Sequence, residues 1–321
     1  MRKSISAVKP PMRSKPSKSK GAKIAIVLPV LDEEKAIGKV LEEIVTAMHE
    51  FKRDVIVVDG HSADRTVDIA KSKGAKVIFQ SGKGYGDALA TALDYASVNR
   101  IPLMAMLDGD GTYNPGDLPK MIEAMEQTAA DIVVGNRFAN RDPESLSAVY
   151  SVGNRVLSWF ARVATGIKVQ DTQSGLRLLR TDAVQRLDLG AAGMPFATEM
   201  LVEAHQAGAK VIEVPVSYRA RVGSKKVGAL KHGASILVSI LRLMRDYRPI
   251  LFFGGFGAIL MAAGGLLGIR VVVEWLTTGT ITHLASVMLS ALLIMSGVQI
   301  VTLSLVADMI RKNREFIRKT T

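Results

Sequence analysis

Leu103-Met104-Ala105-Met106-Leu107-Asp108-Gly109-Asp110 is an apolar run that ends in two carboxylates one residue apart. A short apolar run of this length predicts a buried β-strand. The two aspartates then lie where the strand gives way to a loop, so both can face one divalent cation. Mg²⁺ and Mn²⁺ prefer oxygen ligands and commonly share their site with substrate phosphates. Such pairs also begin ordinary turns, so the pair by itself leaves a metal site and a plain turn open.

The chain around this run alternates short apolar runs with helical patterns. Strands are expected at residues 24–28, 55–58, 76–79, 103–107 and 132–134, and helices at about 34–49 and 64–73. This alternation predicts a mainly parallel sheet with helices on both faces. Ligands of such sheets bind beyond the carboxyl ends of the strands. Asp32, Asp59 and Asp108 all follow or end a predicted strand, so we expect them at one edge of the sheet.

The positive charge of the chain is concentrated at its start. The 321 residues carry a net charge of +12, and eight of these charges fall within residues 1–23, which contain no Asp or Glu. The first 22 residues are also rich in Ser and Pro, so we expect a disordered basic tail at 1–22. Because most of the net positive charge lies in this tail, we expect no nucleic-acid partner. Near a membrane, each basic charge contributes roughly 1 kcal/mol of attraction to anionic headgroups. A solvated tail without a partner is the alternative.

The absence of cysteine from the sequence excludes disulfides, zinc thiolate sites and thiol nucleophiles. A length of 321 residues accommodates one large α/β domain and an appendage. We place the domain at residues 23–228. The sequence leaves the oligomeric state open.

Two long apolar segments near the C-terminus predict a membrane hairpin. Residues 250–269 and 284–307 carry no charged side chain, and each is long enough to cross a hydrocarbon core of about 30 Å as a helix. A buried helix pair of a soluble protein is the alternative. We therefore expect a hairpin over 250–308, with spans at about 250–272 and 284–307, and a basic tail at 309–321.

The charges that flank the hairpin predict its orientation in the lipid bilayer. Arg242, Arg245 and Arg248 precede the first span, and five basic residues follow the second. Because basic flanks remain in the cytoplasm, we expect a two-pass protein of the cell membrane with both termini and the 23–228 domain on the cytoplasmic side. Residues 229–249 mix apolar and basic side chains, which predicts an amphipathic helix on the membrane surface, with a domain-packing helix as the alternative.

Eight short motifs share an order and spacing typical of one enzyme family. They are Pro29–Glu34, Val57–Thr66, Gly82–Asp87, Asp108–Asp110, Gly135–Phe138, Asp171–Arg177, Ala197–Met200 and Val214–Arg219. Together they resemble family 2 glycosyltransferases of GT-A fold over about residues 23–245. They are most similar to the polyprenyl-phosphate sugar synthases typified by dolichyl-phosphate mannose synthase. The resemblance implies an α/β GT-A domain with a mainly parallel sheet, followed by the interfacial helix and the hairpin.

The resemblance implies an inverting hexosyltransferase that uses Mg²⁺ or Mn²⁺. The donor would be a nucleotide-diphospho-sugar, and the acceptor a polyprenyl or dolichyl phosphate. Gly60-His61 and the segment 108–113 are more similar to relatives that use UDP-sugars, although GDP-mannose stays open. The sequence departs from the family at Asp32, where an Asn is usual, and at Asp59-Gly60, where an Asp-Asp pair is frequent.

The resemblance also assigns roles to single residues. Asp108, Asp110 and Glu199 would be catalytic, and Asp108 and Asp110 would hold the metal. Nucleotide-sugar contacts are implied for Pro29, Asp32, Glu33, Asp59, Lys83, Asp108 and Gln173. An acceptor-phosphate contact is implied for Arg137, and we expect Arg155 to join it. Arg219, Arg221, Ser224 and Lys225 lie just before the predicted interfacial helix, where a lipid phosphate would arrive, so we expect acceptor-phosphate contacts there as well.

Each of these assignments has a purely structural alternative. Asp32 or Glu33 could cap the helix that follows, and Lys83 could lie in an ordinary glycine turn. Glu199 could be an acid favoured by a helix dipole. Any one arginine could be a solvated surface residue.

Two other functions compete with glycosyl transfer to a lipid phosphate. A processive polysaccharide synthase would carry a Gln-x-x-Arg-Trp motif, but neither Trp159 nor Trp275 follows an arginine. A non-catalytic sugar-nucleotide-binding protein or a component of a lipid-sugar flippase is the other alternative. The acids and arginines of the domain favour an enzyme.

Overall fold

The computed structural model describes residues 22–141, 148–185, 196–222 and 248–320, together with 238, 241, 242, 244 and 245. It divides into two compact units. One comprises Ser14–Ser239, and the other comprises Met1–Arg13 with Ile240–Thr321. Of the predicted basic tail (1–22) only residue 22 is described, and of the predicted interfacial helix (229–249) only 238, 241, 242, 244, 245, 248 and 249 are described, so both stay predictions.

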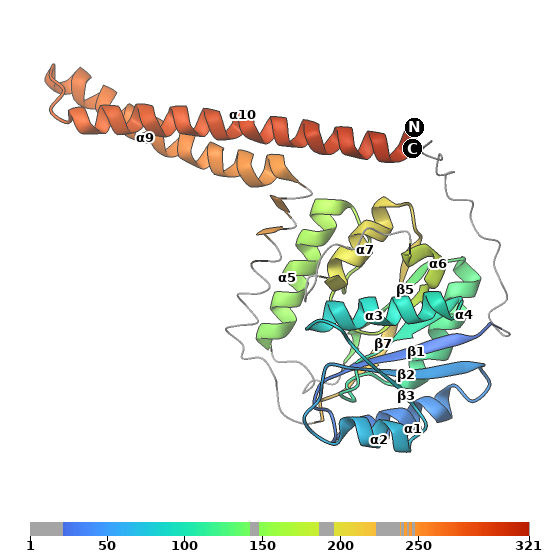
Figure 1. Cartoon of the computed structure of the whole chain (residues 1–321). Helices are drawn as coiled ribbons and strands as arrows, with labels where there is room; N and C mark the ends of the chain where they lie inside the picture. The colour runs from blue at the N-terminus through green and yellow to red at the C-terminus, as the bar shows by residue number, and fades with distance from the viewer. Residues whose placement is uncertain are drawn as a thin grey trace. The chain divides into compact units, whose positions relative to one another are not determined.

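The first unit is built on a sheet of seven described strands in the order β3-β2-β1-β4-β6-β5-β7. Figure 1 labels β1, β2, β3, β5 and β7 of this sheet. β1 pairs in parallel with β2 and β4, β2 with β3, and β5 with β7, whereas β6 is antiparallel to β4 and β5. The mainly parallel sheet is therefore confirmed, with one reversed strand. The strands are β1 Ile24–Val30, β2 Arg53–Asp59, β3 Lys76–Phe79, β4 Leu103–Met106, β5 Ile132–Arg141, β6 Arg177–Arg180 and β7 Val211–Tyr218.

Helices cover both faces of this sheet because the strand side chains alternate in direction. Ile24, Ile26 and Leu28 of β1 pack in one core with α1 and α4, while Ala25 and Val27 pack in a second core with α3 and α7. The helices are α1 Ile37–Ala47, α2 Thr66–Ser72, α3 Tyr85–Val98, α4 Leu118–Thr128, α5 Ala148–Thr165, α6 Thr181–Val184 and α7 Phe196–Gln206, with a 3₁₀ turn η2 at Pro115–Asp117.

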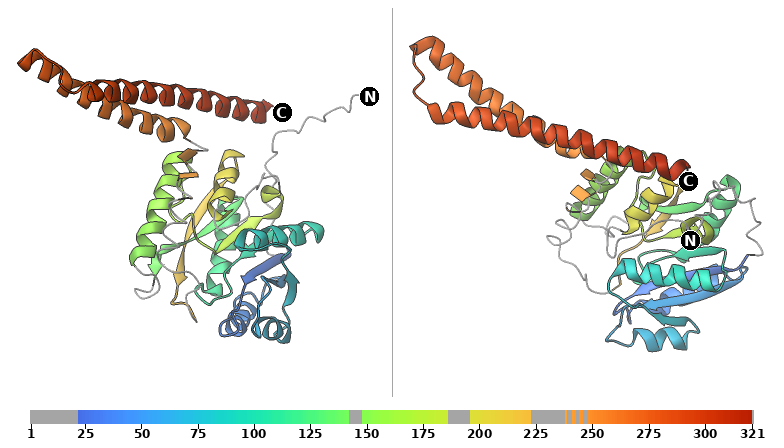
Figure 2. Two further views of the ribbon diagram at one scale, coloured as in Figure 1. Left: turned by 60° about the vertical axis from the view of Figure 1, so that its left-hand side comes forward. Right: turned by 45° about the horizontal axis from the view of Figure 1, so that its top comes forward.

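The second unit is a pair of antiparallel helices. A π-helical turn η3 (Ile250–Gly254) leads into α9 (Gly255–Thr278), and α10 (Leu284–Thr320) returns alongside it in both views of Figure 2. The segments Ile250–Thr278 and Leu284–Asn313 are long and apolar enough to cross a membrane, with a mean hydropathy of 2.1 each. Only 11% of each apolar window is buried, which is less than the helix pair of a soluble core would show.

The two helices meet at glycines. A Cβ on Gly257 would lie 2.7 Å from the carbonyl oxygen of Gly297, and one on Gly264 would lie 2.9 Å from the carbonyl oxygen of Ser290. The hydroxyl of Ser290 donates to the carbonyl of Gly264 at 2.7 Å. Small residues thus bring the two backbones close together, as expected for helices that associate in lipid.

Candidate active site

The predicted aspartates lie at one edge of the sheet. β1, β2 and β4 are parallel neighbours, so their carboxyl ends meet at the same edge. Asp59 is the last residue of β2 and pairs in register with Val30, while Asp32 and Asp108 follow β1 and β4 by two residues. The candidate site is therefore where ligands of open α/β sheets bind.

Ser62 joins the first two loops of the site. Its hydroxyl donates to Oδ1 of Asp59 at 2.5 Å and accepts from the backbone N–H of Asp32 at 2.9 Å. Its own N–H donates to Oδ2 of Asp59 at 2.9 Å. Asp59 is fully buried, so in this structure its carboxylate holds the loop together. Ser62 belongs to the motif Val57–Thr66, but its role was not predicted from the sequence, because only the fold brings its hydroxyl between the two loops.

Asp32 and Glu33 do not cap α1. The helix starts after Ala36 without a side-chain cap, so the capping alternative is not what the structure shows. Asp32 has a φ of 50°, a left-handed conformation that aspartate tolerates better than most residues. Its Oδ1 accepts from the N–H of Ala63 at 2.7 Å. The Oε1 atom of Glu33 instead contacts Nη2 of Arg221.

Asp110 is held by the loop that follows it. Its Oδ1 accepts from the N–H of Thr112 at 3.1 Å and from the Thr112 hydroxyl at 2.6 Å. Its Oδ2 lies 3.1 Å from Nη1 of Arg221. The carboxylate is buried, with 9% of the residue exposed. One oxygen is therefore fixed by the loop, and the other faces a positive charge.

Asp108 lies beside Asp110 and against a glycine. Burial, together with a smaller contribution from the neighbouring Asp110 carboxylate, raises the pKa of Asp108 to about 7, although nearby guanidinium groups oppose the shift. A Cβ on Gly175 would lie 2.5 Å from Oδ2 of Asp108. Only a glycine therefore lets the loop before β6 pack so closely against this carboxylate.

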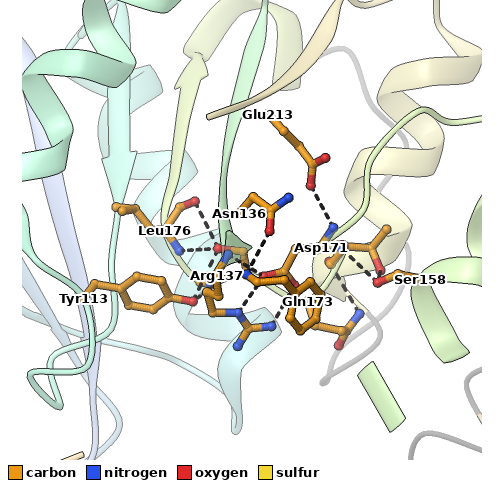
Figure 3. A network of polar contacts seen from close by, with 12 residues as sticks. Tyr113, Asn136, Arg137, Ser158, Asp171, Gln173, Leu176 and Glu213 are labelled. Atoms are coloured by element: carbon orange, nitrogen blue, oxygen red, sulfur yellow. Dashed lines mark hydrogen bonds and ion pairs between the residues drawn. The ribbon is translucent and has the colours of Figure 1, made fainter. Parts of the chain in front are cut away.

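Arg137 is held by a carboxylate in a buried ion pair (Figure 3). Its Nε and Nη2 donate to Oδ2 and Oδ1 of Asp171 at 2.7 and 2.8 Å, and its backbone N–H donates to Oδ2 at 3.1 Å. The two side chains are 8% and 0% exposed. Glu213 accepts from the N–H of Asp171 at 2.7 Å, and the guanidinium lies 5.4 Å from the Tyr218 ring centre. The fork that was expected to bind the acceptor phosphate is thus already bound within the chain.

The same loop brings Gln173 to the neighbouring helix. Gln173 donates through Nε2 to the Thr198 hydroxyl on α7, and the N–H of Gly175 donates to the Tyr113 hydroxyl at 2.6 Å. Gln173 is half-buried, and Tyr113 is buried. These contacts fix the loop from two sides.

The remaining predicted residues are more scattered. Arg219 pairs through Nη1 with the carboxylate of Glu43 on α1 at 3.0 and 3.1 Å, and Arg155 lies over the Phe138 ring at 5.3 Å. Lys83 is exposed, and Pro29 is a half-buried residue of β1. Glu199 is in α7, but its side chain lies outside what the structure describes, as do Ser224 and Lys225.

Asp108 and Asp110 fit a hard divalent cation that is shared with a ligand. Within the described residues, no group of three or more His, Cys, Asp or Glu side chains gathers as a complete metal site. A cation here would take its remaining ligands from phosphate and water, as Mg²⁺ usually does. The guanidinium beside Oδ2 of Asp110 shows that a cation is accommodated at this point.

The sequence matches the family model of glycosyl transferase family 2 over residues 25–188, just over half of the chain. The chain belongs to this family. It is 30% identical over 289 residues to glycosyltransferase AglJ of Haloferax volcanii, covering 89% of this chain and 93% of that protein. It is also 32% identical over 225 residues to a dolichyl-phosphate hexose transferase of the same organism, covering 70% of this chain and 95% of that protein.

Solved structures support the GT-A-type fold of this glycosyltransferase. Glucosyl-3-phosphoglycerate synthase from Mycobacterium tuberculosis, in complex with Mn²⁺, UDP and glucosyl-3-phosphoglycerate, superposes with a TM-score of 0.57 at 21% identity. The match covers 72% of this chain and 81% of that one. At this identity the likeness concerns the fold alone.

Proposed function

We propose that this glycosyltransferase transfers a hexose from a nucleotide-diphospho-sugar to a polyprenyl or dolichyl phosphate. The observation that carries the proposal is the charge arrangement at the sheet edge. Of the two carboxylates suited to a divalent cation, Asp108 lies within electrostatic reach of the guanidinium groups of Arg137, Arg177 and Arg221, and Asp110 is paired with Arg221. A site with both signs of charge suits the reaction of one phosphate compound with another.

The donor side of the site is formed by the loops after β1, β2 and β4. We place the nucleoside by Pro29, Asp32, Glu33 and Asp59, and the diphosphate near Lys83, Asp108 and Asp110, with Gln173 towards the sugar. A bound Mg²⁺ or Mn²⁺ would neutralise the charge that develops on the leaving diphosphate. We favour a UDP-sugar as the donor, because Gly60-His61 and the segment 108–113 resemble relatives that use UDP-sugars.

On the acceptor side, the lipid phosphate needs no strong general base, because it is already ionised at neutral pH. Its oxygen forms the new bond to the anomeric carbon as the bond to the nucleoside diphosphate breaks, so direct attack inverts the anomeric configuration. We assign the acceptor phosphate to Arg155 and Arg219 with Ser224 and Lys225, and to Arg137, whose Nε and Nη2 are held by Asp171 and which therefore contributes its positive charge. A guanidinium that is not held in this way can bind two phosphate oxygens with fixed geometry. Glu199 is assigned to orienting the sugar hydroxyls.

The relative named as a dolichyl-phosphate hexose transferase and the two apolar helices support a lipid acceptor. The arginines that precede the first helix and the basic residues that follow the second favour a cytoplasmic domain. The site would then be on the side of the membrane where the nucleotide-sugars are made.

A donor screen on the full-length protein in lipid nanodiscs tests this function. UDP-glucose, UDP-N-acetylglucosamine and GDP-mannose, each radiolabelled in the sugar, are supplied with polyprenyl phosphate and Mg²⁺ or Mn²⁺. We expect label in the organic-extractable lipid with one donor, and none with Asp110→Asn. Label that requires polyprenol in place of its phosphate, or that appears only as free sugar, contradicts the proposal.

A further inference from the structure

Arg221 occupies the place in the candidate site where a divalent cation is expected. Its Nη1 lies 3.1 Å from Oδ2 of Asp110, and its Nη2 contacts Oε1 of Glu33. The two acidic side chains are 12% and 10% exposed, and Arg221 is 27% exposed. One guanidinium therefore bridges the loop after β1 and the loop after β4.

The backbone brings Arg221 to this position. The N–H of Arg219 donates to the carbonyl of Thr112 at 2.8 Å, and the N–H of Val222 donates to the carbonyl of Asp110 at 3.3 Å. The segment after β7 therefore runs beside the Asp110–Thr112 loop. Arg221 lies between these two bonds, so its side chain is directed at the Asp110 carboxylate by local geometry.

The contacts of Arg221 are incomplete. Its Nε is buried and has no hydrogen-bond partner within the part of the chain that the structure describes. In Arg137, by contrast, Nε and Nη2 both donate to the two oxygens of Asp171. A buried donor without a partner carries a desolvation cost, so the Arg221 bridge is held less firmly than the Arg137 pair.

We propose that Arg221 is an internal counter-cation, which neutralises Asp110 and Glu33 in the metal-free enzyme and is displaced when the metal–nucleotide complex binds. This inference rests on the proposed function, because it takes the donor to arrive with a divalent cation. Asp110 Oδ1 is bound by Thr112, so Oδ2 is the oxygen left for a cation. A divalent ion and a guanidinium at the same oxygen repel each other, so one must leave.

The displaced guanidinium has a new anionic partner in the bound donor. A diphosphate offers oxygens that match the guanidinium fork. Binding of a cation alone therefore removes Arg221 from its partners without replacing them, whereas binding of the cation with a nucleotide replaces them. We expect the metal to bind weakly alone and more tightly together with a nucleoside diphosphate.

The test is a titration of the full-length protein in detergent with Mn²⁺, in which the electron paramagnetic resonance signal reports free Mn²⁺. Each protein is titrated with Mn²⁺ alone, and then in the presence of UDP or GDP. The wild type is compared with Arg221→Gln, which removes the charge, and with Arg221→Lys, which keeps it. Arg219→Gln is the matched control, because Arg219 lies two residues away but pairs with Glu43.

For Arg221→Gln we expect Mn²⁺ alone to bind roughly tenfold more tightly, the factor that corresponds to one charge-assisted hydrogen bond. The gain in Mn²⁺ affinity on adding nucleotide should shrink in the same variant. Arg221→Lys and Arg219→Gln should both bind Mn²⁺ as the wild type does, with and without nucleotide. Circular dichroism and thermal unfolding confirm that each variant is folded.

An unchanged or weaker affinity of Arg221→Gln for Mn²⁺ alone would overturn the proposal and leave Arg221 as a structural ion pair. Tighter Mn²⁺ binding by Arg221→Lys would do the same, since the charge would then be irrelevant. The variant Asp110→Asn separates this failure from a failure of the proposed function. If Asp110→Asn binds Mn²⁺ as the wild type does, Asp110 is not a metal ligand, and the metal site of the proposed function is wrong.

Discussion

Arg137 and Arg221 both lower the pKa of Asp108, but the chain holds them in different ways. Arg137 is 8% exposed and bound by both oxygens of a buried carboxylate, whereas Arg221 is 27% exposed and shares two carboxylates while its Nε has no described partner. A complete buried pair fixes geometry, because removing either partner leaves a charge uncompensated. A bridge with an unmet donor is easier to exchange for another cation. The site thus combines one firmly paired positive charge with one that, as we infer, is exchanged for a metal ion.

The largest expected effect comes from breaking the fixed pair. Asp171→Asn leaves the Arg137 guanidinium buried without its counter-charge, and we expect a loss of about 3–5 kcal/mol in the free energy of unfolding. Glu33→Gln, which removes one charged partner of Arg221, should cost less, because Arg221 keeps its contact with Asp110 and is itself 27% exposed. Chemical denaturation of both variants measures the difference. Equal losses would erase the distinction between the two arginines.

The carboxylate that Arg221 contacts should matter more for activity than for stability. We expect Asp110→Asn to lower kcat by roughly 10²–10³-fold, the range seen when one group that stabilises transition-state charge is removed, and to leave the unfolding transition nearly unchanged. Chelation of divalent cations should produce a comparable loss in the wild type. Full activity in chelator would remove the cation from the mechanism.

A smaller effect should follow from moving Asp108 without changing its charge. The Cβ of Gly175→Ala would lie 2.5 Å from Oδ2 of Asp108, so the carboxylate must shift. We expect about a tenfold loss of kcat, since a misplacement near 1 Å can cost up to ~10²-fold. Gly38→Ala is the control, because its Cβ meets only the Ile69 methyl group at 3.3 Å. If both variants keep full activity, the position of Asp108 is not critical.

The smallest effect is expected for Arg219, whose pair with Glu43 is 41% exposed on the arginine side. Arg219→Gln should change the free energy of unfolding by less than about 1 kcal/mol, as for other exposed ion pairs. Saturation with the lipid phosphate is the second readout, because Arg219 was assigned to the acceptor. A rise in the acceptor KM with stability intact would support that assignment, and no change in KM would withdraw it.

Much of the fold was predictable because continuous apolar runs identify buried strands. The expected strand at 76–79 has the observed bounds, and the run at 103–107 corresponds to β4 at Leu103–Met106. The helix expected at about 34–49 is shorter, at Ile37–Ala47, because residues 34–36 form a turn. β6 was not predicted, since Arg177–Arg180 is only four residues long and polar at both ends. Its reversed direction carries no local sequence signal.

The edge of the sheet that holds the site was predictable, but its ion pairs were not. Strand ends locate Asp32, Asp59 and Asp108, and the parallel pairing brings them together. The partner of Asp110 is Arg221, which is distant in sequence and was grouped with the acceptor contacts. Arg137 was expected to present a free fork, and its pairing with Asp171 depends on how β5 and the loop before β6 meet. Contacts of this kind come from tertiary packing, which motif spacing does not encode.

The reversal of β6 has a consequence for how the site could diverge. In a parallel sheet every loop at the edge that holds the site follows the carboxyl end of a strand, so its first residues also determine where that strand ends. β6 runs the other way beside β4, so the segment with Asp171, Gln173 and Gly175 arrives at this edge before its strand begins. A parallel β6 would deliver it about 13 Å away, at the opposite edge, given some 3.3 Å per residue. Apart from Asp171 and Gly175, whose contacts hold Arg137 and Asp108, this segment can therefore vary in composition while the strands that carry the acidic residues stay as they are.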